Sequence, residues 1–184
     1  MDTAELIQYR HTADRFGEVV SAVTDWDAPT PVPEWRARDV VGHLTTWLPG
    51  LLSSDGIELP VGDHEHPVGS WQALDTALRT LLAQDPTRPF SHPMAGEGTV
   101  TEIVARLFTP DVFLHTWDLA RASGQPDRLD GDRCTAMLDG MRSIEPMLRA
   151  SGQFGVQQPE PDDADPTDRL IAFVGRDPRW TPSG

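Results

Sequence analysis

The chain has 184 residues, of which 38% are hydrophobic, and a formal net charge of -14. Such an acidic chain lacks the basic footprint that nucleic acids and anionic membranes require, so we expect neither as a partner. Its single cysteine, Cys134, excludes an internal disulfide and a metal site built from several thiolates. There is no apolar run of about 18 residues and no signal-peptide pattern at the start, so we expect a cytoplasmic protein without a membrane span.

The first two predicted elements are helices separated by a proline-rich break. Apolar residues recur at three- and four-residue steps over residues 2–24, which predicts an amphipathic helix. The segment Asp27–Pro33 carries three prolines and must end it. A second helix is expected from residues 35–39 onward, and Pro49 should kink or end it after one more turn.

Two polar connections surround the third predicted helix, which runs from Trp71 to Asp85-Pro86. The first connection contains the sequence Asp63-His64-Glu65-His66. Alternating acids and imidazoles could bind metal, but H-x-H in a loop bounded by Gly and Pro is a weakly specific signal, so we interpret the segment as a solvated loop. The second connection, residues 86–98, is rich in Pro and Gly and is expected to be irregular. His92 and Glu97 lie in it and could reach a site as a lid.

The fourth predicted helix begins at Thr99, where Glu102 completes a capping box, and stops at Ser123-Gly124. Pro110 lies inside this helix and predicts a kink immediately before Asp111. A fifth helix should follow Asp130, and a short one should cover 165–174. The inner face of the fifth helix is expected to carry Met137, Met141, Ile144 and Leu148.

These elements predict an all-α fold, a bundle of four main helices with extra C-terminal helices. No segment shows the clear period-two alternation of a half-buried strand. We expect residues 1–150 to form the helical bundle. Residues 151–184, rich in Gly, Pro and Asp at their start, should form an extension packed on the bundle or trailing from it.

The most informative stretch of the chain is the middle of the fourth helix. Asp111, His115 and Asp118 follow one another at i, i+4 and i+7, so they share one helix face, and that face is also the apolar one. Ionisable groups in a buried stripe need partners. A divalent metal would satisfy them, because Asp and His at i, i+4 bring their tips together. A buried hydrogen-bond network is the alternative interpretation.

Two motifs, with the C-terminal sequence, connect the chain to a known group. They are Trp35-x4-Val40-x2-His43-Leu44 in the second helix and Asp111-x3-His115-x-Trp117-Asp118 in the fourth. Together they resemble the DinB/YfiT-like superfamily, and within it the metal-binding domain of mycothiol-dependent maleylpyruvate isomerase. The ending, Asp168 to Phe173 followed by Gly175-Arg176-Asp177-Pro178, is similar to an uncharacterised actinobacterial branch of that group.

The resemblance implies a DinB/YfiT-like four-helix bundle that holds a divalent metal through His43, Asp111 and His115. Taken by itself, His43 would be interpreted as a packed or half-exposed residue. Many members of the group carry Glu or His where this chain has Asp111, whose side chain is shorter than that of Glu by a methylene. Little chain follows the bundle, so the additional C-terminal domain of the isomerase is not expected.

Two imidazoles and one carboxylate leave a coordination position open, which is typical of catalytic metal sites. Zinc is the expected metal by ligand type, and nickel is possible. The leading hypothesis is a transferase or isomerase that uses mycothiol or a similar thiol against a small electrophile, with Asp118 orienting an imidazole or a water molecule. The alternatives are a metal-dependent small-molecule hydrolase and a non-enzymatic metal-binding or sensor module. A homodimer is possible.

Overall fold

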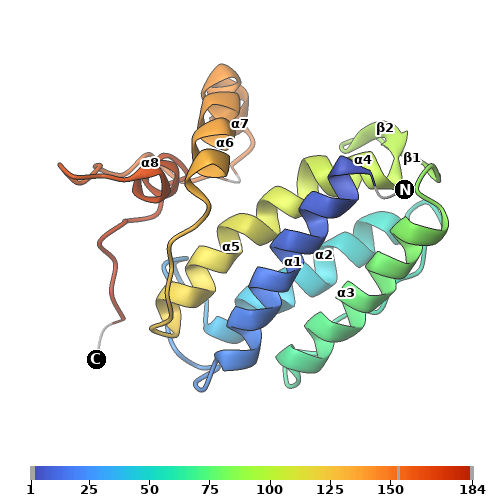
Figure 1. The fold of residues 1–184 in the computed structure, drawn as a ribbon, viewed down its shortest axis with the longest axis horizontal. Coiled ribbons are helices and arrows are strands. Elements are labelled where there is room, and N and C mark those ends of the chain that lie inside the picture. Colours follow the sequence, from blue (N-terminus) through green and yellow to red (C-terminus); the bar gives the residue numbers. More distant parts are fainter. Residues whose placement is uncertain (1–2, 153, 183–184) are drawn as a thin grey trace.

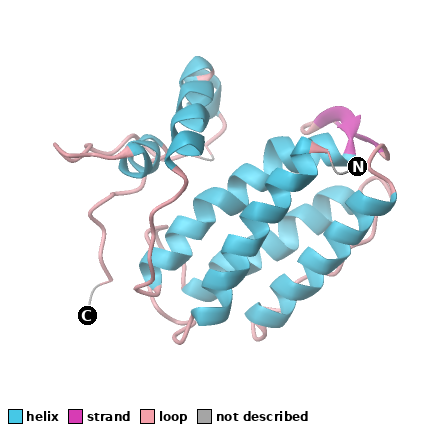
Figure 2. Cartoon of the chain, viewed as in Figure 1, coloured by secondary structure: helices cyan, strands magenta, loops and turns pink. Residues whose placement is uncertain are grey.

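The computed structural model describes residues 3–152 and 154–182, and Figures 1 and 2 show that helices dominate this part of the chain. The expected all-α fold is confirmed. Within the described residues no helix is long and apolar enough to cross a membrane. The elements in chain order are α1 (Ala4–Ala22), α2 (Ala37–Ser53), α3 (Pro67–Gln84), β1 (Pro89–His92), β2 (Gly96–Thr99), α4 (Val100–Ile103), η1 (Val104–Phe108), α5 (Thr109–Ala122), α6 (Gly131–Ser143), α7 (Glu145–Ala150) and α8 (Pro166–Phe173).

Four long helical segments pack around one core. Helix α1 lies against α3 and α5, and α2 lies against the same two helices on the other side, so the four close into a bundle (Figure 1). Their apolar faces meet in a buried cluster that includes Tyr9, Phe16, Leu44 and Trp71. Burying these faces drives the helices together, because an isolated amphipathic helix gains little stability from propensity alone.

The fourth segment of the bundle is continuous but irregular. Thr99 caps it as expected, because its hydroxyl accepts from the Glu102 amide while the Glu102 carboxylate accepts from the Thr99 amide. One turn before Asp111 the helix widens into the π-helical stretch η1, where the Thr109 N–H reaches the Val104 carbonyl. Pro110 lacks the N–H that a regular helix would use there, so the interruption expected from the sequence takes the form of a π-bulge.

The connection between α3 and α4 was expected to be irregular, and this expectation is wrong. Strands β1 and β2 form an antiparallel hairpin in which Phe90 is opposite Gly98. Phe90 is the one side chain of β1 that is fully buried. Because β2 is largely glycine, the sequence has no alternation of apolar and polar residues that would reveal the pair.

The fifth predicted helix is broken in the structure. Helix α6 ends at Ser143 and α7 begins at Glu145, with Pro146 in its first turn, where a missing N–H is tolerated. Ile144 lies at the break and is 44% exposed, so its predicted inward position is wrong. Cys134 and Leu138 are the buried residues of α6.

A second apolar cluster joins the C-terminal helices to the bundle. Helix α6 packs on α8, and buried residues of both helices share one apolar cluster with Phe113, Leu114 and Trp117 of α5. Helix α5 therefore has apolar partners on two sides, which explains why almost all of its residues are buried. Trp117 is fully buried in this cluster. The division of the chain at residue 150 stays a prediction.

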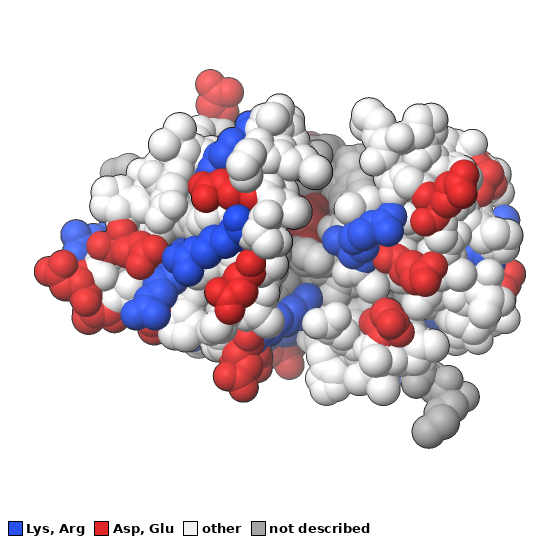
Figure 3. Space-filling model, turned by 90° about the horizontal axis from the view of Figure 1, so that it is seen from above, with Lys and Arg blue, Asp and Glu red and all other residues white. Residues whose placement is uncertain are grey.

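Figure 3 views the molecule from above and shows the surface of the bundle and of the C-terminal helices. Acidic and basic side chains alternate over this face, without a continuous basic patch on it. The surface is hollowed where the C-terminal helices meet the bundle (Figure 3).

Candidate metal centre

Helix α2 supplies the first side chain of the centre. His43 lies on the border between the apolar and the exposed faces of α2, and one third of its side chain is exposed. Its Nε2 atom lies 3.0 Å from Oδ2 of Asp111, although 68 residues separate the two in the sequence. The packing of α2 against α5 therefore brings the two motifs together.

Helix α5 supplies the other two side chains from one face. Asp111 and His115 are one turn apart, and Nε2 of His115 lies 3.5 Å from Oδ1 of Asp111. His115 is buried, whereas the Asp111 side chain is 27% exposed. The spacing of four residues predicted this convergence, because it places both side chains on the same side of the helix.

The geometry of the three side chains fits a single divalent cation. Each offers one ligand atom, and these atoms all lie within 4.8 Å of one another. Ligands bound about 2.1 Å from a tetrahedral ion lie about 3.4 Å apart. The two oxygens of Asp111 are at similar distances from the imidazoles: Oδ2 lies 3.0 Å from His43 Nε2, and Oδ1 lies 3.5 Å from His115 Nε2. Two imidazole nitrogens and one carboxylate oxygen are also a donor set that zinc and nickel accept. No other group of three such residues comes together in the part of the chain that the structure describes.

Electrostatics favour an ionised carboxylate at the centre. Burial acts to raise the pKa of Asp111, but the charge of His115 and the hydrogen bond and charge of His43 outweigh it. A hydrogen bond from the Trp47 indole, whose Nε1 lies 2.9 Å from Asp111 Oδ2, acts in the same direction. The pKa of Asp111 is therefore lowered from its ordinary value of 3.8, and the carboxylate is ready to bind a cation.

Asp118 fixes the orientation of His115 from the side opposite the centre. Its Oδ2 lies 2.9 Å from Nδ1 of His115, so the imidazole donates its Nδ1 proton to this carboxylate and its Nε2 faces Asp111. Arg176 pairs with the same carboxylate through two of its nitrogens. Burial acts to raise the pKa of Asp118, but Arg176 and His115 together lower it to about 2.

The rings of Trp35 and Trp47 form an apolar wall beside the imidazoles, with the Trp47 ring 6.3 Å from that of His43. The ring of Trp35 is stacked 5.5 Å from the ring of His115 and lies 5.1 Å from that of His43. Trp35 belongs to the loop before α2, which an antiparallel bridge between Pro29 and Arg36 holds in place. These rings limit the access of water to one side of the candidate centre, which strengthens electrostatic interactions there.

The other histidines considered as ligands lie elsewhere. His66 is exposed and bonds with Asp63 in its own loop, at 2.9 Å. His64 is half exposed, and its ring covers Gly42. Nδ1 of His92 accepts from the amides of Met94 and Ala95, so His92 closes the hairpin turn. None of these three rings joins the cluster.

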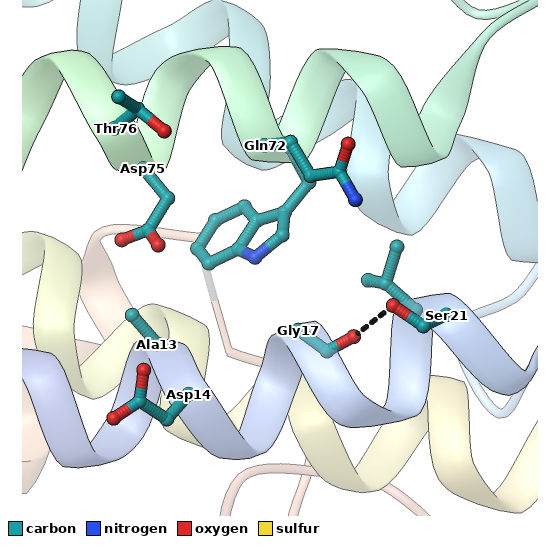
Figure 4. Close-up of a pocket in the computed structure, with 9 residues that line it drawn as sticks. Ala13, Asp14, Gly17, Ser21, Gln72, Asp75 and Thr76 are labelled. Atoms are coloured by element: carbon teal, nitrogen blue, oxygen red, sulfur yellow. Dashed lines mark hydrogen bonds between the residues drawn. The ribbon is translucent and has the colours of Figure 1, made fainter.

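A groove of about 220 Å³ lies between α1 and α3, away from the three ligand residues. Figure 4 shows it bordered by Gly17, Asp14 and Asp75. Trp71 also lines it. The Ser21 hydroxyl, which also borders it, donates to the Gly17 carbonyl (Figure 4). It shares no residue with the candidate centre.

The fold and the cluster define this protein as an all-α helical bundle with a candidate divalent-metal centre of two histidines and one aspartate. Residues 9–54 match the family described as the mycothiol maleylpyruvate isomerase N-terminal domain, so the expected resemblance is confirmed. The matched segment includes most of α1 and all of α2. It therefore contains His43, whereas Asp111 and His115 lie outside it.

Two mycobacterial proteins are similar over most of the chain. They are the uncharacterized protein MT0763 of Mycobacterium tuberculosis (strain CDC 1551 / Oshkosh) and the uncharacterized protein Rv0738 of Mycobacterium tuberculosis (strain ATCC 25618 / H37Rv). Each is 27% identical over 177 residues, which cover 93% of this chain and 97% of the relative. No solved structure matches the chain significantly.

Proposed function

We propose that this protein binds one divalent metal through His43, Asp111 and His115 and uses it, with a low-molecular-weight thiol, to transform a small electrophile. The observation that carries the proposal is the convergence of these three ligand atoms from two helices within 4.8 Å. The match of residues 9–54 to the mycothiol maleylpyruvate isomerase N-terminal domain supports mycothiol or a similar thiol as the cosubstrate. Zinc is the proposed metal by ligand type, with nickel as the alternative.

The metal, when bound, would lower the pKa of a thiol at its open coordination position, so that the thiol is ready to attack as a thiolate. The chain itself supplies the surroundings of that position. His115 is held in one orientation by Asp118, and Asp111 is kept ionised by its neighbours. Trp35 covers one side of the imidazoles.

The thiol must come from outside the protein. Cys134 is the sole cysteine of the chain; it lies buried in the cluster around α6 and α8. Burial also raises the pKa of its thiol to about 11, so the thiolate is scarce at neutral pH. A soluble thiol is therefore the nucleophile in this proposal, and the reaction would be a thiol transfer or an isomerisation.

The test compares metal-free protein with protein reloaded with zinc, cobalt or nickel, using mycothiol, cysteine or glutathione and a panel of electrophiles that includes maleylpyruvate. We expect turnover only when both metal and thiol are present, and loss of turnover in His43→Ala. His66→Ala, which removes an exposed imidazole of the solvated loop, should behave as the wild type. Metal-dependent hydrolysis without a thiol would replace the proposal with a hydrolase. Stoichiometric metal without any turnover would leave a binding or sensor module.

A further inference from the structure

A buried line of polar contacts leads from the candidate metal centre to the C-terminal segment. Nε and Nη2 of Arg176 lie 3.0 and 2.9 Å from Oδ1 and Oδ2 of Asp118. Oδ2 of Asp118 lies 2.9 Å from Nδ1 of His115, whose other ring nitrogen faces Asp111. Two contacts thus connect the guanidinium of Arg176, which is 58 residues from Asp118 along the chain, to the proposed metal ligand His115.

Asp118 depends on Arg176 for its charge compensation. The Asp118 side chain is completely buried, and only 14% of the Arg176 side chain is exposed. A buried carboxylate without a partner is costly, and the two-pronged geometry of an arginine satisfies both of its oxygens. The His115 ring reaches Asp118 through Nδ1 alone, so it cannot replace the guanidinium, which pairs with both oxygens.

The turn after α8 places Arg176 next to Asp118. Gly175 has a φ of +91°, which favours glycine, and the Arg176 amide then donates to the Ile171 carbonyl at 3.0 Å. A Cβ at Gly175 would lie 2.6 Å from the Cα of Gly155, so the backbone crossing also requires glycine. Arg121 of α5 holds the following residues by donating to the Pro178 carbonyl at 2.6 Å.

We propose that Arg176 is a positioning residue for the metal centre: it holds the Asp118 carboxylate so that Asp118 fixes the His115 ring with Nε2 directed at the metal position. In this proposal the C-terminal segment contributes to the geometry of the metal centre through Arg176. This inference rests on the proposed metal site, but it concerns a residue that touches neither the metal nor the substrate. A partner of this kind typically changes metal affinity about 10- to 100-fold when it is lost.

The test measures zinc affinity by competition with a chelating dye and the visible absorption spectrum of the cobalt(II)-loaded protein. The variants are Arg176→Ala, Arg176→Lys and the control Arg179→Ala. Arg179 is also an arginine of the C-terminal segment, but it is exposed. We expect Arg176→Ala to weaken zinc binding about 10- to 100-fold and to shift the cobalt spectrum. Arg176→Lys should lie between this variant and the wild type, because an ammonium cannot pair with both oxygens in a fixed geometry.

Chemical rescue separates positioning from folding. Millimolar guanidinium chloride, compared with sodium chloride at equal ionic strength, should restore part of the zinc affinity of Arg176→Ala and leave Arg179→Ala unchanged. Wild-type zinc affinity and a wild-type cobalt spectrum in Arg176→Ala would overturn the inference, even if the melting temperature fell. Failure of the wild type to bind either metal would refute the proposed function instead. If Arg176→Ala does not fold, Arg176→Lys decides through the same two readouts.

Discussion

The Nε2 atom of His43 and the Oδ2 atom of Asp111 lie 3.0 Å apart, although one belongs to α2 and the other to α5. This contact joins two distant sequence motifs in one centre, and His115 completes it from the next turn of α5. The geometry of the centre therefore depends on how α2 packs against α5.

Replacing any one ligand should remove most of the metal binding. Alanine at His43, Asp111 or His115 leaves two ligands. Loss of a side chain that only hydrogen-bonds to a ligand typically costs about 10- to 100-fold in metal affinity, so loss of a ligand should raise the zinc dissociation constant by more than about 100-fold. Isothermal titration of metal-free protein measures this, with His66→Ala as the control. A variant that keeps the wild-type stoichiometry and affinity would show that its residue is not a ligand.

Trp47→Phe should weaken the centre without removing a ligand. The substitution keeps an aromatic ring beside Phe108 but deletes the indole N–H that donates to Asp111. The pKa of Asp111 should rise, and zinc affinity should fall about tenfold. Competition titrations near pH 6 and pH 8 test this. Equal affinity of Trp47→Phe and the wild type at both values would contradict a role for the hydrogen bond.

Acid should destabilise the metal-free protein through Asp118. Its pKa is about 2 in the folded chain against an ordinary 3.8, so its contribution is present above about pH 4 and is lost as the pH falls toward 2. The difference corresponds to about 2 kcal/mol of unfolding free energy. Urea unfolding from pH 5 to pH 2.5 measures the loss, and Asp118→Asn should show a shallower pH dependence. An unchanged slope in this variant would assign the acid sensitivity to other carboxylates.

Cys134 should be inert in the folded protein. Its side chain is fully buried and burial raises the pKa of its thiol to about 11, so a disulfide reagent at pH 8 should modify it only after unfolding. Cys134→Ala should keep the thiol-dependent turnover, with a cost in stability of about 1 kcal/mol for the lost packing. Rapid modification of the native protein, or loss of turnover in Cys134→Ala, would show that the internal thiol takes part.

The sequence by itself determined the helices and the local part of the centre. Helical periodicity places Asp111, His115 and Asp118 on one face whatever surrounds them, and the cap at Thr99 is satisfied within four residues. A kink before Asp111 was likewise predicted from the missing N–H of Pro110, and the structure shows that the interruption is a π-bulge. His43 was assigned to the centre only through resemblance to a family, because the position of a residue in one helix says nothing about its distance from another helix.

Only the tertiary structure decided what completes the centre. Arg176 belongs to the C-terminal sequence that carried the resemblance, but the sequence assigned it no role, because that role depends on the turn at Gly175 and on the docking of α8 beside α5 through the second apolar cluster. The Trp47 contact with Asp111 was missed for the same reason. The hairpin of β1 and β2 was missed because its short, glycine-containing second strand shows no alternation of apolar and polar residues. Contacts within a helix follow from a fixed repeat, whereas contacts between elements depend on how whole surfaces pack.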